Sequence, residues 1–423
     1  MARLPVAAFR ATSVSGRRCL AAEPQPQRTT RTAQSATARM PASCRTFYDA
    51  AVPDVVELFT DLAALPSPPG EEREVADRVT LYLRELGLDV DEDDAGPRVG
   101  STIGNLFCRL EPTHEGGVPI FLCAHLDTVP PEGPIEPVLE DGVVKNAAQT
   151  ILGADNKAAV ASMLDAARRV VEENRAHAGL ELLFTPKEEV GLHGAAAFDH
   201  TRLAARLGYV YDQAAPIGEV ILGAPYSQSL EVRFHGRAAH SGMYPEEGRS
   251  AIQAAARAIA DLRLGRIDDE TTANVGLIEG GTAGNIVPEW CTFLAEARSH
   301  DERKLADLVQ EMLDAITFAA GVGECEVETT VQKSYRGYRF RRDDLPVRLA
   351  AAALERSGFA PAYALSGGAA DANVFNERGL PCVNLANGMA NIHTAEESIS
   401  VADLEGMVEV TLALVDVARE TEG

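Results

Sequence analysis

The feature that most constrains the fold is an alternation of short, mainly apolar segments with segments of helical spacing. Residues 118–124, 180–185 and 207–212 are apolar runs of strand length, and a helical pattern over 156–173 separates the first run from the second. Strands that alternate with helices are typical of a layered domain in which helices cover a sheet. This part of the sequence therefore predicts an α/β fold with a largely parallel central sheet flanked by helices.

The neighbouring segments continue this pattern on both sides. Apolar residues at spacings of three and four predict helices, and short apolar runs predict strands. The further predicted elements are a helix over 75–86, a strand over 102–110, a helix over 344–357, a glycine-rich turn over 366–371, a strand over 381–386 and a closing helix from Ser400.

A different order of elements interrupts the α/β pattern. The predicted elements are a strand, a helix, two strands, a helix and a strand, at 229–235, 249–264, 272–278, 290–298, 301–320 and 324–331. This order, β-α-β-β-α-β, is that of a ferredoxin-like α+β sandwich. We therefore predict an inserted lid domain over 225–333, within a main domain formed by 46–224 and 334–423.

The first 45 residues differ in composition from the rest. They contain eight Arg, no Lys and one acid, Glu23, which gives a local charge of 8 − 1 = +7. Arg-rich, Ser-rich and acid-poor starts occur in organelle transit peptides, and a disordered tail is the alternative. A third interpretation is a translation start assigned too far upstream, with Met40 as the true start. All three leave residues 1–45 outside the fold prediction.

The charge and the cysteines limit the class of protein. The 423 residues carry 39 basic and 63 acidic side chains, a formal charge of −24. Because such a surface repels phosphates, we expect no nucleic-acid and no membrane partner. No apolar stretch approaches the roughly 18–20 residues that span a bilayer. Seven scattered cysteines without a CxxC pair indicate a reduced, cytoplasmic protein with buried thiols.

Two acidic positions and one histidine stand at ends of the predicted elements. His125 ends an apolar run, and Asp127 can reach its imidazole because residues i and i+2 of a strand point to the same side. A carboxylate that holds a histidine in this way is common behind metal-bound imidazoles. Asp155 precedes the predicted helix, and taken alone it is best interpreted as the N-cap.

Further acids and a second histidine follow other strands. Glu188 and Glu189 come after the run at 180–185, Asp212 ends the next strand, and His393 follows the strand at 381–386. Adjacent carboxylates repel each other, which raises the pKa of one and suits it to general-base work. A solvated acidic turn is the alternative for the two glutamates.

Ligands of open α/β sheets gather beyond the carboxyl ends of the strands. The strand ends named above carry, in order, a histidine, two glutamates, an aspartate and a histidine. Histidine and carboxylate donors without paired cysteines favour Zn²⁺, Mn²⁺ or Co²⁺.

Taken together, these motifs resemble the metal signature of the M20 metallopeptidases. The matching segments are 125–130, 152–158, Glu188-Glu189, Asp212 and His393, in the family's order. The resemblance covers roughly residues 52–417 and includes the inserted domain. Within the family the chain is most similar to the peptidase T aminotripeptidases, through 150–155 with Lys157, Gly367-Gly368 before Asp371, and 391–394 with Glu397.

The resemblance implies two divalent metal ions. Zinc is the expected metal, and cobalt or manganese are the alternatives. His125 and Asp212 would bind one ion, Glu189 and His393 would bind the other, and Asp155 would bridge both. The two ions would lower the pKa of a bound water and polarise the scissile carbonyl.

The resemblance also implies catalytic roles. Asp127 would orient His125, and Glu188 would be the general base that takes a proton from the metal-bound water. In the lid, His240 lies in Gly236–Gly242, which matches the family's loop whose histidine helps to hold the oxyanion.

Three residues match substrate-binding positions of the family. They are Asn285, Arg298 and Gly368. The guanidinium of Arg298 suits a peptide's terminal carboxylate, and an ordinary strand-end Arg is the alternative. A simple turn is the alternative for Asn285 and Gly368. Three departures from the family's pattern, at 146–149, 213–216 and 369–370, border the predicted pocket and bear on substrate preference.

The function that follows is a two-metal exopeptidase that acts on short peptides, with release of the N-terminal residue of tripeptides as the first choice. The alternatives are a dipeptidase, a carboxypeptidase or an N-acyl-amino-acid deacylase with the same metal site, and a catalytically silent binding protein. The lid could also form the interface of a homodimer.

Overall fold

The computed structural model describes residues 54–422. The predicted N-terminal extension at 1–45, with the alternative start at Met40, lies outside the described residues. The five cysteines within the described part of the chain are unpaired. None of its helices is both long and apolar enough to cross a bilayer.

A nine-stranded mixed sheet forms the centre of the fold, in the order β1-β2-β6-β3-β7-β16-β8-β14, with β15 paired to β8. Its middle strands β6, β3, β7 and β16 run parallel, whereas β2 and β8 are antiparallel to their inner neighbours. The predicted α/β class is confirmed, and the sheet is parallel in its middle and between β15 and β8. The strands are β1 Val90–Glu92, β2 Leu106–Leu110, β3 Ile120–His125, β6 Leu180–Thr185, β7 Leu207–Gln213, β8 Glu219–Ala224, β14 Tyr338–Arg339, β15 Ala362–Leu365 and β16 Cys382–Ala386.

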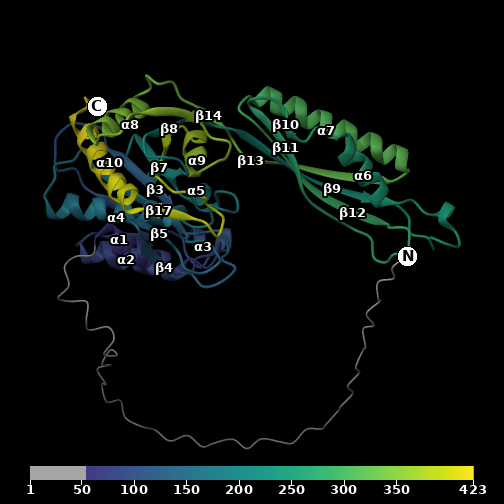
Figure 1. Cartoon of the computed structure of the whole chain (residues 1–423). Helices are drawn as coiled ribbons and strands as arrows, with labels where there is room; N and C mark the ends of the chain where they lie inside the picture. The colour runs from purple at the N-terminus through teal and green to yellow at the C-terminus, as the bar shows by residue number, and fades with distance from the viewer. Residues whose placement is uncertain (1–53, 423) are drawn as a thin grey trace, which may run out of the picture. The chain divides into compact units, whose positions relative to one another are not determined.

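Helices cover both faces of this sheet (Figure 1). The larger apolar core lies under α1 Val55–Ala63, α2 Arg73–Glu85, α4 Ala154–Glu172, α8 Leu345–Arg356 and α10 Val401–Glu420. A smaller core on the opposite face lies under α5 His193–Ala197 and α9 Asp371–Glu377, and α3 Ala95–Val99 contacts α5. Burial on both faces explains why the middle strands are almost wholly apolar.

Side chains of β3 show how the sheet positions the site. Leu122 and Ala124 belong to the larger core, whereas Phe121 and Cys123 belong to the smaller one. Because successive side chains alternate between faces, His125 points to the side of the smaller core. The carboxyl ends of β3, β6 and β7 therefore present their polar residues at one edge of the sheet.

A second sheet has its own apolar core. Its five strands run antiparallel in the order β10-β11-β12-β9-β13, and α6 and α7 supply the rest of the core (Figure 1). The elements are β9 Tyr226–His235, α6 Ala251–Asp261, β10 Gly265–Arg266, β11 Thr271–Gly280, β12 Trp290–Ser299, α7 Glu302–Gly323 and β13 Glu326–Tyr335. This is the predicted ferredoxin-like order, with the short β10 added; the exact domain limits stay a prediction.

Some small elements were not predicted. A three-stranded sheet, β17-β5-β4, consists of β4 Pro137–Glu140, β5 Val143–Asn146 and β17 Ser398–Ser400. Two short 3₁₀ helices lie at His200–Arg202 and Pro245–Glu247. The predicted strand at 102–110 begins only at Leu106, because the Asp93 carboxylate accepts hydrogen bonds from the Ala95 and Asn105 amides and holds the preceding segment as a turn.

Candidate metal centre

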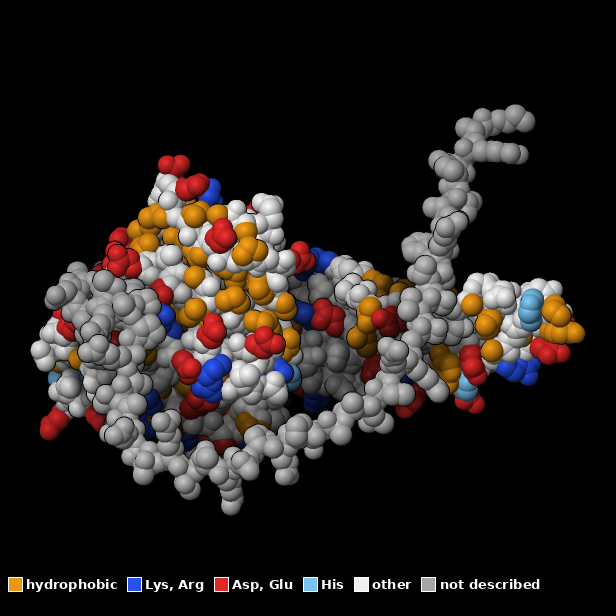
Figure 2. Space-filling view, turned by 90° about the horizontal axis from the view of Figure 1, so that it is seen from below, with side chains coloured by type: hydrophobic (Ala, Val, Ile, Leu, Met, Phe, Trp, Pro, Cys, Tyr) orange, Lys and Arg blue, Asp and Glu red, His pale blue; other side chains and the backbone are white. Residues whose placement is uncertain are grey.

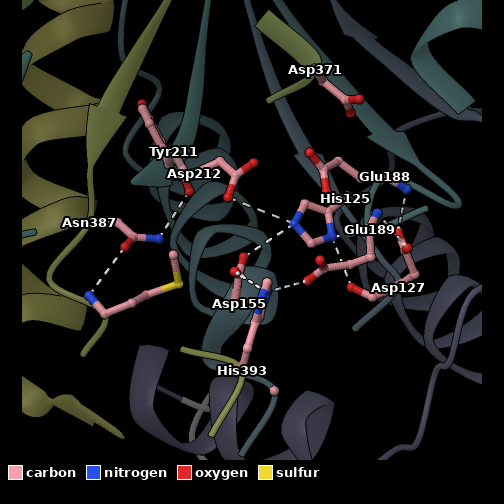
Figure 3. A network of polar contacts seen from close by, with 12 residues as sticks. His125, Asp127, Asp155, Glu188, Glu189, Tyr211, Asp212, Asp371, Asn387 and His393 are labelled. Atoms are coloured by element: carbon pink, nitrogen blue, oxygen red, sulfur yellow. Dashed lines mark hydrogen bonds and ion pairs between the residues drawn. The ribbon is translucent and has the colours of Figure 1, made fainter. Parts of the chain in front are cut away.

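His125 ends β3 with its imidazole fixed in one tautomer. Its Nδ1–H donates to the backbone carbonyl of Asp127 at 2.8 Å. The Nε2 atom then faces carboxylate oxygens of Asp155 at 3.2 Å and Asp212 at 3.9 Å (Figure 3). A neutral imidazole with its proton on Nδ1 offers only a lone pair there, so a cation between these atoms satisfies all three groups.

Asp127 holds more than the imidazole. Its carboxylate is fully buried and accepts hydrogen bonds from the backbone amides of Glu188 at 2.9 Å and Glu189 at 3.1 Å. We predicted that this carboxylate would orient His125, which stays a prediction: its Oδ1 lies 3.5 Å from Nδ1, and the Asp127 backbone carbonyl makes the shorter contact at 2.8 Å. Asp127 therefore fixes the turn that carries the two glutamates.

Asp155 lies between the two histidines. Its Oδ1 faces His125, and its Oδ2 faces Nε2 of His393 at 3.3 Å. The interpretation of Asp155 as a helix N-cap is wrong, because α4 begins after Gly153 and no described amide of that helix donates to the Asp155 carboxylate. Its carboxylate is turned to the histidines instead (Figure 3).

The remaining predicted ligands come from separate elements. Glu189 follows β6, and its Oε1 lies 3.0 Å from Nε2 of His393, in the loop after β16. Asp212 lies near the end of β7. Its backbone is held by the side chain of Asn384, which accepts from the Asp212 N–H at 2.9 Å and donates to the Asp212 carbonyl at 2.8 Å.

Two sets of side chains offer ligand atoms within 4.8 Å of one another. One set is His125, Asp155 and Glu189, and the other is His125, Glu188 and Asp212. All five side chains were predicted for this site. The second set includes Glu188, which we predicted as a base and not as a ligand.

The predicted substrate residues Arg298 and Gly368 lie far apart in the sequence, but the structure brings their segments into contact. Arg298, in β12, donates to the carbonyl of Gly367 at 3.3 Å and to Glu296 at 2.9 Å, and its guanidinium lies over the ring of Tyr335. The amide of Gly368 donates to the Ser366 hydroxyl at 3.1 Å. Arg298 therefore has a local acidic partner, Glu296 and not Asp301.

His240 and Asn285, the other two predicted residues of the lid, lie in loops that contact each other. The Ser241 amide donates to the Asn285 carbonyl at 3.1 Å, and the ring of His240 accepts from two following amides at 3.2 Å. Both residues are exposed. Among the described residues, no hydrogen bond or ion pair joins His240 or Asn285 to the cluster around Asp155.

Comparison with known proteins finds relatives over most of the chain. A family model described as a peptidase dimerisation domain matches residues 223–324, and one described as peptidase family M28 matches residues 105–226. The uncharacterized protein YqjE of Bacillus subtilis is 38% identical over 366 residues, which span 86% of this chain and 98% of that protein.

Two solved structures extend the similarity to the whole fold. An aminopeptidase PepT from Bacillus cereus is 39% identical, with a TM-score of 0.79 over 86% of this chain and 98% of that one. The chain belongs to the M20 family of metallopeptidases. A second solved structure, a tripeptidase from Staphylococcus aureus, is 32% identical, with a TM-score of 0.82 over 87% of this chain and 98% of that one. The predicted family is confirmed, and the protein is a hydrolase of the peptidase T-like group.

The electrostatics of the cluster suit the metal centre of an M20 enzyme. Burial, followed by the charge of Asp212, raises the pKa of Glu188 well above its usual range. Burial and the charge of Asp155 raise the pKa of Asp212 to about 7. Contacts with Asp155 and Glu189 raise the pKa of His393 to about 10. These carboxylates repel one another, and divalent cations among them would remove that repulsion.

Three residues that support this M20 site were not predicted as site residues. Asn384 holds Asp212, as described above, and Thr185 donates to the Asp371 carboxylate at 2.5 Å beside the cluster. The carboxylate of Glu397 accepts three backbone amides at the turn that carries Asp155. Glu397 belongs to the segment that resembles the peptidase T group, but no local pattern indicates the contacts of these three residues, because their partners lie far away in the sequence.

Proposed function

We propose that this M20 protein is a two-metal exopeptidase that releases the N-terminal residue of tripeptides. The observation that carries the proposal is the position of Asp155, whose two carboxylate oxygens face two different imidazoles, each with a further carboxylate beside it. A carboxylate in this position can serve two cations at once. The similarity to a tripeptidase and to PepT supports the substrate class.

Each ion would have its own pair of ligands besides the shared one. We assign His125 and Asp212 to one ion, Glu189 and His393 to the other, and Asp155 to both. Imidazole and carboxylate donors favour zinc, with cobalt or manganese as substitutes. When bound, the cations would polarise the scissile carbonyl and stabilise the charge that develops on its oxygen.

The side chain of Glu188 moves the proton in this proposal. Its raised pKa suits a group that takes a proton from the attacking water and passes it to the leaving amine. The backbone of Glu188 is fixed because its amide donates to the Asp127 carboxylate. Asp127 therefore acts by keeping the base at a constant position beside the cluster.

The lid residues would recognise the rest of the peptide. The half-buried Arg298 would bind the terminal carboxylate, because a guanidinium forms paired hydrogen bonds with it. Gly368 would approach the substrate through its backbone. We assign oxyanion stabilisation to His240 and a neighbouring substrate contact to Asn285, whose loops are hydrogen-bonded together.

We expect the metal-loaded protein to remove one residue from the N-terminus of free tripeptides. N-acetylation should abolish cleavage, and C-terminal amidation should raise KM by removing the partner of Arg298. Mass spectrometry of the products from a small panel, which includes dipeptides and N-acyl amino acids, shows which end is trimmed. Turnover of N-acyl amino acids without turnover of tripeptides would instead indicate a deacylase.

We also propose a homodimer formed through the second sheet. The match to a peptidase dimerisation domain covers this region. Strand β10 pairs only with the beginning of β11, so the rest of β11 is an open edge, with Leu277 and Ile278 nearly half exposed. Open apolar edges of this kind pair readily with a second chain.

Ile278→Asp should convert the dimer to a monomer, because a charge on the paired edge opposes association. Light scattering after size-exclusion chromatography measures the mass directly. Leu139→Asp, at an exposed apolar position of β4, is the matched control and should leave the dimer intact. A wild-type protein that elutes as a monomer at micromolar concentration would contradict the dimer.

A further inference from the structure

We infer that Glu397 is a positioning residue that preorganises the two-metal cluster by fastening Asp155 to the loop of His393. The inference rests on the proposed two-metal function. It assigns Glu397 no direct contact with metal or substrate.

Glu397 is buried and uses both carboxylate oxygens at one turn. Its Oε2 accepts from the amides of Leu152 and Gly153, both at 2.8 Å, and its Oε1 accepts from the amide of Asp155 at 2.9 Å. With both oxygens occupied by N–H groups, Glu397 is not placed as a ligand, and it belongs to neither potential metal set. Its effect on the cluster must therefore pass through the backbone of Asp155.

The turn that Glu397 holds would not keep its shape by local bonds alone. The helix that follows has Gly153 at its N-cap with no side-chain cap, so its first amides depend on a partner from elsewhere. Glu397 supplies a partner for one of them, the Asp155 amide, across 242 residues of sequence. The amides of Leu152, Gly153 and Asp155 all donate to this carboxylate, and three such hydrogen bonds favour a charged acceptor.

The other end of the connection is the loop that carries His393. The Glu397 amide donates to the Thr394 carbonyl at 3.2 Å, and the Thr394 hydroxyl donates to the Asn391 carbonyl at 2.7 Å. These bonds tie His393 and Glu397 into one short unit, and β17 directly after it pairs with β5. Glu397 therefore sets the position of Asp155 relative to His393, whose facing atoms lie 3.3 Å apart.

Glu397→Gln tests this inference with little change in shape. The amide group of Gln places an NH₂ against a backbone N–H, so at least one of the three hydrogen bonds becomes a repulsion. Metal-free protein is titrated with Co²⁺ and followed by visible absorption, with Zn²⁺ measured by competition with a chromogenic chelator. We expect affinity to fall by about 10- to 100-fold, as for other residues that orient metal ligands.

Two variants separate positioning from general stability. Glu396→Gln changes the exposed neighbour and should leave metal affinity unchanged. Glu181→Gln is the matched buried control, because Glu181 also accepts two backbone amides, from Ala204 and Ala205, and lies in a separate network with Arg109. It should lower thermal stability and leave the Co²⁺ spectrum and affinity as in the wild type.

Three results would overturn the inference. Wild-type affinity in Glu397→Gln, while the wild type binds two ions, would reject the role of Glu397 and leave the proposed function intact. Equal loss of affinity in Glu181→Gln would show a stability effect only. A wild type that binds no Co²⁺ would reject the proposed function itself.

Hydrogen exchange keeps the inference testable if Glu397→Gln does not fold. In metal-free wild-type protein, the amides of Leu152, Gly153 and Asp155 should already be protected, because Glu397 holds them before any ion binds. Protection that appears only after metal is added would contradict preorganisation.

Discussion

Glu188→Gln should abolish most peptidase activity while the protein retains its metal ions. General-base catalysis typically contributes about 10²- to 10⁴-fold to the rate, so kcat should fall by that amount. The substitution keeps the size of the side chain and removes only its ability to accept a proton. Steady-state kinetics on a tripeptide and metal analysis of the same preparation measure both quantities.

The metal content decides between two roles for Glu188. The side chain belongs to one of the two potential ligand sets, together with His125 and Asp212. If Glu188 is the base, its loss leaves the number of bound ions unchanged. Loss of an ion in Glu188→Gln would identify Glu188 as a ligand, and unchanged turnover would reject it as the base. Glu396→Gln, at an exposed position, is the control and should behave as the wild type.

Asp155→Ala should have the second large effect, the loss of both ions and of activity. Its carboxylate faces His125 on one side and His393 on the other, so each ion would lose a ligand and the two histidines would lose their shared negative partner. Asp212→Ala should release mainly one ion, because the Asp212 carboxylate faces His125 and not His393. Metal stoichiometry of the two variants, dialysed side by side, checks the difference.

Two outcomes would contradict the shared position of Asp155. Retention of both ions in Asp155→Ala would show that the carboxylate is not a ligand. Equal loss of ions in Asp155→Ala and Asp212→Ala would show that the two carboxylates serve the same ion or ions. Far-ultraviolet circular dichroism of both variants controls for unfolding.

Local periodicity predicted where the elements lie, because it depends only on neighbouring residues. The predicted strand at 180–185 is β6, and the predicted helix at 156–173 is α4, which begins two residues earlier and ends one residue earlier. The direction of a strand could not be predicted in the same way, because it depends on a distant partner. Strand β2 pairs antiparallel with β6, about seventy residues further along the chain, for example at Arg109 and Glu181. Nothing in the sequence of β2 indicates that direction.

The same limit applies to the site. Because ligands gather beyond the carboxyl ends of the strands, we predicted that His125, Asp212 and the two glutamates lie close together. The structure places them in one cluster. The same rule could not give the contacts of Asp155, because an aspartate before a helix can cap that helix or turn away from it. In the structure the Asp155 amide donates to Glu397, and the Asp155 carboxylate faces His125 and His393.

The surface adds little to the prediction of function. Figure 2 shows acidic, basic and apolar side chains interspersed over the face turned to the viewer. The net charge of −24 includes the +7 of residues 1–45, so residues 46–423 carry −24 − 7 = −31. Five of those acids, Asp127, Asp155, Glu188, Glu189 and Asp212, lie in or beside the cluster. Part of the acidity therefore belongs to this cluster of potential metal ligands.

The most direct test of the account is the number of metal ions in the active enzyme. We predict that inductively coupled plasma mass spectrometry of active wild-type protein finds about two divalent ions per chain. Removal of the ions by a chelator should abolish tripeptide cleavage, and addition of Zn²⁺ or Co²⁺ should restore it up to that stoichiometry. Full activity with one ion or none per chain would contradict the two-metal centre around Asp155.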